Sequence, residues 1–129
     1  MSSERGSITV VTAAVIGLAL ICSMGAADIA KALVARAHAE AAADAVALAV
    51  AQELAFPSGR DTEGIAVEYA QRNDATLLSC ECPADGTEAI VEVELPVGSL
   101  LLLPDDRTAT AWARAVVDMP GATGPSGSG

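Results

Sequence analysis

The chain has 129 residues, a formal net charge of −10, and 7 lysine and arginine residues against 17 aspartate and glutamate residues. This length leaves room for one long helix and one small domain, so a two-domain organisation is excluded. Without a basic patch, direct nucleic-acid binding is disfavoured. Most of the negative charge follows residue 56, where we expect it to keep an exported domain soluble.

Residues 7–27 form an apolar segment without a single charged side chain. At a helical rise of about 1.5 Å per residue, the segment is about 30 Å long, which matches the hydrocarbon core of a bilayer. No proline separates it from residues 28–56, in which alanine, the best helix former, predominates. The sequence therefore predicts a leader (residues 1–6), a transmembrane helix (7–27) and an alanine-rich continuation of the same helix (28–56).

A cleaved signal peptide is the alternative interpretation of the first 27 residues. Gly25 and Ala27 could occupy the −3 and −1 positions of a signal-peptidase site. The product would be a small acidic exported binding protein. A retained anchor is favoured, because the apolar run is longer than a typical signal core and the helical pattern continues past Ala27 without a break.

Small residues recur on the apolar helix at a spacing of four, which is typical of helices that approach one another closely. These candidate packing positions are Ala13, Gly17, Ser23 and Ala27. Asp28 follows them and marks the end of the apolar segment, with Lys31 as an i,i+3 partner. The alternative is an intramembrane carboxylate that contacts a neighbouring subunit.

The rest of the chain predicts a small α+β head (residues 57–119) and a flexible Gly- and Pro-containing tail (120–129). A second helix is expected from Asp61 to about Asn73. Strands are expected at 76–82, 88–95 and 107–118, because apolar and polar residues alternate there. The last strand has one face of small side chains, and we expect this face to pack on the alanine-rich helix. The fold class is therefore α+β, with a long N-terminal helix against a small antiparallel sheet of about three strands.

The run from Leu100 to Leu103 lies between the last two expected strands. Such a run can be a buried extension of a strand or an exposed loop patch that contacts a partner. Burial is favoured from the sequence.

Cys80 and Cys82 are candidates for a disulfide. On a regular strand their side chains would be nearly 7 Å apart, whereas bonded Cβ atoms lie about 4 Å apart, so a bond would require a bulge. Pairing between subunits and a reduced, buried pair are the alternatives. The two cysteines and the single His38 are poor support for a metal site. Because no catalytic or cofactor-binding set stands out, we expect a non-enzymatic protein without metal, cofactor or small-molecule substrate.

Two stretches carry a family resemblance: residues 4–11 (ERGSITVV) and residues 32–54 (ALVARAHAEAAADAVALAVAQEL). With the apolar run and Asp28, they resemble the TadE/TadG-like proteins of Flp-type (tight adherence) pili, and most closely the short actinobacterial TadE-like form. The resemblance implies a pilin- or pseudopilin-like fold and a minor pilin or pseudopilin of a Flp-type pilus or of a related secretion apparatus. It leaves open whether that pilus serves cell adhesion, DNA uptake or secretion. It implies a single-pass membrane protein with a cytoplasmic N-terminus and an extracytoplasmic head. Its implied partners are other pilins, an assembly ATPase and the platform proteins of the membrane.

The same resemblance implies a processing site for prepilin peptidase between Gly6 and Ser7. Pilins usually have glutamate at the fifth residue after this bond, where the present sequence has Val11. We therefore expect a subunit that is used once or a few times, and not the major pilin.

Overall fold

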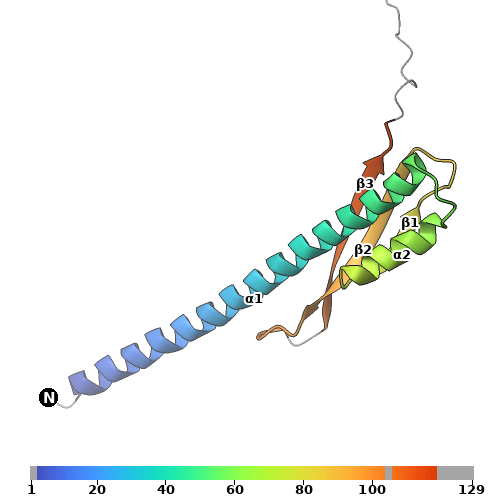
Figure 1. Ribbon diagram of the computed structural model, residues 1–129. Coiled ribbons are helices and arrows are strands. Elements are labelled where there is room, and N and C mark those ends of the chain that lie inside the picture. The colour runs from blue at the N-terminus through green and yellow to red at the C-terminus, as the bar shows by residue number, and fades with distance from the viewer. Residues whose placement is uncertain (1–2, 104–105, 119–129) are drawn as a thin grey trace, which may run out of the picture.

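The computed structural model of the protein describes residues 3–103 and 106–118. Two helices and three strands follow one another in the order α1 (Ser3–Ala55), α2 (Thr62–Arg72), β1 (Thr76–Glu81), β2 (Glu88–Gly98) and β3 (Arg107–Val116). The expected tail, residues 120–129, lies outside the described residues. Figure 1 shows α1 as a rod whose C-terminal half lies on the head and whose N-terminal half extends away from it.

Helix α1 is one continuous element of 53 residues, about 80 Å long at the standard helical rise. It contains no proline, and it ends at Ala55, just before Pro57 removes a backbone donor and restricts the preceding residue. Every described side chain from Arg5 to Leu20 is exposed except Gly17, which is partly covered. Contact with the head begins near Gly25 and Asp28 and continues to Leu54. The apolar N-terminal part thus fits a membrane span, as predicted.

Helix α2 begins with a side-chain cap. Asp61 accepts a hydrogen bond from the backbone N–H of Gly64 at 2.8 Å, which satisfies one donor of the first turn. The helix ends at Arg72, and Asp74 then adopts a positive φ of 55° that turns the chain into β1. These limits agree with the expected helix between Asp61 and Asn73.

The three strands form an antiparallel sheet in the order β1-β2-β3. Strand β2 is longer than expected, since it runs through Pro96 to Gly98 with a register shift between these two residues. Strand β1 has a register shift between Leu77 and Ser79, and it ends one residue earlier than expected. Both helices cover the same face of the sheet, with α1 over β2 and β3 and α2 beside it over β1 (Figure 1).

The core is made mostly of small side chains. Val46 and Val50 of α1 meet Val91 and Val93 of β2, and all four are fully buried. Alanines fill the remaining positions, so the backbone of α1 can approach the sheet closely. The alanine face of β3 is buried at Ala111 and Ala113, Ala109 and Ala115 are partly buried against the core, and Thr110, Trp112 and Arg114 on the other face are exposed. The predicted α+β fold and the packing of a small-residue strand on an alanine-rich helix are thereby confirmed.

Candidate functional site

The N-terminal half of α1 presents a long apolar surface that the head does not cover. Its large aliphatic side chains are more than half exposed: Ile8, Val10, Val11, Val15, Ile16, Leu18, Leu20 and Ile21. A soluble monomer rarely exposes an apolar area of this extent, so the surface requires lipid or other helices around it.

Within this surface, the four candidate packing positions remain accessible. Ala13, Ser23 and Ala27 are exposed, and no atom lies within 4 Å of the place where a Cβ would stand on Gly17. The hydroxyl of Ser23 donates to the carbonyl oxygen of Ala19 at 2.8 Å, so its polar group is satisfied within the helix. Their pairing with a second helix stays a prediction.

The expected processing site lies near the beginning of α1. Gly6 and Ser7 are both helical and exposed, and Gly6 has open space where a Cβ would stand. Cleavage at this bond also stays a prediction.

Asp28, a charged residue of α1, is buried, with 7 % of its surface exposed. Its Oδ1 accepts a hydrogen bond from the backbone N–H of Leu101 at 2.7 Å, and its Oδ2 accepts one from Leu102 at 2.8 Å. These two bonds, first that of Leu101 and then that of Leu102, hold the pKa of the Asp28 carboxyl below its usual value. We call this arrangement the Asp28 latch, because it ties the segment between β2 and β3 to α1.

The sequence predicts that Lys31 pairs with Asp28. In the structure, each of these two side chains instead binds backbone groups of the segment between β2 and β3. The ammonium group of Lys31 donates to the carbonyl oxygen of Ser99 at 3.2 Å. Its charge still helps, as the weakest of the favourable contributions, to lower the pKa of Asp28. Two side chains one helical turn apart therefore hold successive parts of the connection between the strands.

The leucine loop, residues 99–103, is what the latch holds. Gly98 precedes it with a φ of +80°, a conformation that favours glycine and lets the chain leave β2 sharply. Leu100 is buried, but Leu101, Leu102 and Leu103 are 55 %, 48 % and 46 % exposed. The expected burial of the run is therefore wrong for three of its four leucines. The reason is that the backbone N–H groups of the loop bind Asp28, which leaves these side chains outside the core.

The leucine loop also reaches the apolar half of α1. A Cβ placed on Gly25 would stand 3.8 Å from Cδ1 of Leu102. Between the loop, α1 and β3 lies an apolar hollow of about 320 Å³, lined by Asp28, Ile29, Ala32, Val97, Leu100, Leu103, Arg107, Thr108 and Ala109. Sequence reasoning missed this site, because 73 positions separate Asp28 from Leu101.

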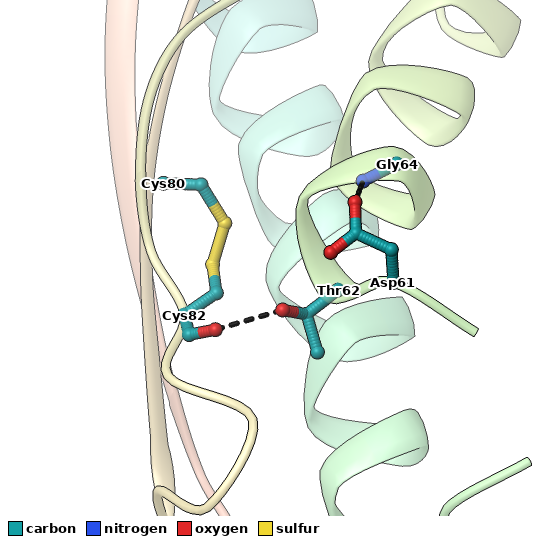
Figure 2. The surroundings of a disulfide bond; sticks show 5 residues. All are labelled: Asp61, Thr62, Gly64, Cys80 and Cys82. Atoms are coloured by element: carbon teal, nitrogen blue, oxygen red, sulfur yellow. Dashed lines mark hydrogen bonds between the residues drawn. A yellow bond between two sulfur atoms is a disulfide. The ribbon is translucent and has the colours of Figure 1, made fainter. Parts of the chain in front are cut away.

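In the structure a disulfide joins Cys80 and Cys82, with 5.4 Å between their Cα atoms. The chain leaves β1 after Glu81, so Cys82 lies outside the regular strand and no bulge between the two cysteines is needed. Figure 2 shows the disulfide beside the beginning of α2, where the hydroxyl of Thr62 donates to the carbonyl oxygen of Cys82 at 2.8 Å. This hydrogen bond connects the end of β1 with α2, while the disulfide joins two residues of that end to each other. Among the described residues, no three His, Cys, Asp or Glu side chains are grouped as a metal site.

The N-terminal part of the chain is similar to a known protein family. Residues 6–53 match the family described as putative Flp pilus-assembly TadE/G-like. The match covers nearly all of α1, including Asp28, and confirms the resemblance over this segment. The family has a structural role in pilus assembly. No curated protein matches the chain, and no solved structure does.

Proposed function

We propose that this protein is a minor pilin-like subunit of a Flp-type pilus or of a related secretion apparatus, with no enzymatic activity. The proposal rests on one observation: the matched segment, residues 6–53, is a single helix whose two parts have different surroundings. One part is apolar and uncovered, and the other forms one wall of a small head.

In this proposal, residues 7–27 anchor the protein as a single-pass helix, with residues 1–6 in the cytoplasm and the head, residues 57–119, outside. Residues 28–56 connect the two and support the sheet. During assembly, the apolar part of α1 exchanges contacts with lipid for contacts with the helices of other pilins. The small residues from Ala13 to Ala27 would let neighbouring helices approach closely. Other pilins and the platform proteins of the membrane are the partners that this model requires.

The number of copies follows from the charges along α1. Cleavage between Gly6 and Ser7 would create an α-amino group in an apolar helix bundle, where an unpaired ammonium is costly. Val11 cannot neutralise it, and Asp28 is about 30 Å away along the helix. The Asp28 carboxylate is moreover bound to Leu101 and Leu102, so it is not free for the amine of a neighbour either. We therefore infer a low-copy subunit at one end of the filament or in its base.

The N-terminal residue of the protein recovered from membranes tests the anchor. Ser7 would mean pilin-type processing, and Met1 or Ser2 would mean an uncleaved anchor; either supports the proposal if the protein also resists carbonate extraction. A soluble exported protein that begins at Asp28 would instead establish the alternative, a small acidic binding protein with a removed signal.

Quantitative mass spectrometry of sheared pili tests the copy number. We expect a small fraction of the amount of the main pilin, whereas comparable amounts would refute the low-copy model. Gly17→Leu tests helix packing, because it fills the open space on the helix surface. It should reduce incorporation into pili, while Leu20→Ile, a matched change on the same exposed helix, should not.

A further inference from the structure

We propose that the leucine loop is a second membrane contact, held at the surface of the hydrocarbon core by the Asp28 latch. This inference rests on the proposed anchoring of residues 7–27 in a bilayer. Its consequence is that the head does not stand free above the membrane on a single helix. It is supported at two points, the helix and the loop, which fix its orientation relative to the bilayer.

The leucine loop contacts α1 near the end of the apolar segment. Leu102 lies against Gly25, which belongs to the last turn of the 7–27 segment. Since Gly25 precedes Ala27 by two residues, Leu102 lies about 3 Å inside the end of the apolar segment. The side chain therefore reaches the depth at which the helix itself leaves the hydrocarbon.

The exposed side chains of the loop are apolar. Leu101, Leu102 and Leu103 each expose about half of their surface, and Leu102 adjoins the apolar part of α1 at Gly25. Removal of such leucine surface from water lowers the free energy by roughly 25 cal/mol per Å². A flexible loop that exposed its backbone groups could not enter apolar surroundings cheaply, because each unsatisfied group is costly there.

The Asp28 latch, together with Lys31, lowers this cost at three backbone groups of the loop. The N–H groups of Leu101 and Leu102 donate to the Asp28 carboxylate, and the carbonyl oxygen of Ser99 accepts from Lys31. The same contacts satisfy both oxygens of a carboxylate that would otherwise face the membrane boundary unpaired. The same hydrogen bonds therefore satisfy the Asp28 carboxylate and backbone groups of the loop, and so lower the cost of placing both in apolar surroundings.

Charged groups near the loop also suit a lipid headgroup layer. Lys31 lies beyond Asp28 on the side of the head, and Arg107 lines the hollow next to Leu103. Cations are common at membrane boundaries, where they meet lipid phosphates. Asp106, the residue before Arg107, is exposed as well and carries the opposite charge.

Depth-dependent quenching in vesicles tests the proposal with the full chain. Cys22 is replaced by alanine, which leaves the Cys80–Cys82 disulfide intact, and single cysteines carry an environment-sensitive fluorophore. The reporter positions are Leu102→Cys in the loop, Leu18→Cys in the proposed span and Leu48→Cys on the exposed side of α1. Leu48 lies about 30 Å beyond Asp28 along the helix, so it is the matched leucine outside the membrane. The vesicles contain phosphatidylcholine with a spin label near the headgroup end of its acyl chain.

We expect a blue-shifted emission and loss of most of the intensity at position 102, and neither change at position 48. If position 18 is quenched and position 102 behaves like position 48, the loop proposal is overturned while the anchor stands. If position 18 is not quenched, the proposed anchoring itself fails. A blue shift at position 102 without quenching by lipid would indicate contact with protein, such as a second copy of the chain, and would also overturn the proposal.

Asp28→Asn in the Leu102→Cys protein tests the latch. The amide replaces one acceptor oxygen by a donor, so it can no longer accept from both loop amides. We expect the quenching at position 102 to fall toward that at position 48, with an unchanged far-ultraviolet circular dichroism spectrum that shows the fold is kept. Unchanged quenching would show that the latch does not hold the loop in the membrane.

Discussion

Replacement of Ala113 by leucine should destabilise the head, because the close approach of β3 to α1 leaves no room for a larger side chain. Ala113 lies opposite Val91 in the sheet register, and its own side chain is buried. Val91 is fully buried, so the neighbouring strand cannot move aside without disturbing the core. Overpacking a core site of this kind typically costs about 1–3 kcal/mol. For a head of this size, about 2 kcal/mol corresponds to a decrease in Tm of roughly 8–16 °C.

The assay is thermal unfolding of the full-length protein in detergent micelles, followed by circular dichroism. Thr110→Leu is the matched control, since Thr110 is exposed on the other face of the same strand. A surface change of this kind usually alters the free energy of unfolding by no more than about 0.5 kcal/mol. If both variants unfolded at the same temperature, close packing of small residues would not be what limits the distance between β3 and α1.

Three further predictions concern the segments that hold the head together. The Asp28 latch should open at low pH. Because the pKa of Asp28 is lowered in the folded state, its stabilisation is present above the ordinary pKa of 3.8 and is lost as the pH falls through the folded-state pKa. The chemical shifts of the loop amides should report this opening. Asp28→Asn should show the open shifts at every pH. Replacing Cys80 and Cys82 by serine should lower the free energy of unfolding by about 1–2 kcal/mol, measured with denaturant, because the closed loop is very short. Gly98→Ala should cost about 1–2 kcal/mol in the same assay, because a Cβ is strained at positive φ, and an unchanged midpoint would contradict this reason.

Much of this fold can be predicted from the sequence, because the signals are local. The C-terminal end of α1 follows from Pro57, and the beginning of α2 follows from a capping aspartate, Asp61, whereas α1 begins at Ser3, four residues before the expected start. The buried faces of β2 and β3 follow from the alternation along each strand, which Ile90 interrupts in β2. The structure buries Ala89, Val91, Val93 and Leu95 on one face of β2.

The latch could not be predicted in this way. No local pattern connects Asp28 with backbone groups of Leu101 and Leu102, which bind as amides and not through their side chains. Four consecutive leucines favour burial on composition alone, and only the direction of the loop after Gly98 decides which of them enter the core. Whether the disulfide could form without a bulge likewise depends on where β1 ends. The strand ends at Glu81, so Cys82 is the first residue outside it.

The two halves of α1 differ in side-chain volume, and this difference explains how one helix serves two surroundings. Before Asp28, valine, isoleucine and leucine give the helix a wide apolar surface, which suits lipid or the helices of other subunits. After Asp28, alanines such as Ala39 and Ala43 reduce the side chains almost to the backbone, which suits a sheet that packs closely on it. On the exposed side the large aliphatic side chains continue to Ile29, Leu33 and Val34, so the change applies to the side that faces the head, where Asp28 binds the leucine loop. Asp28 therefore marks the boundary in the sequence and also fixes, through the loop, where the head begins above the apolar segment.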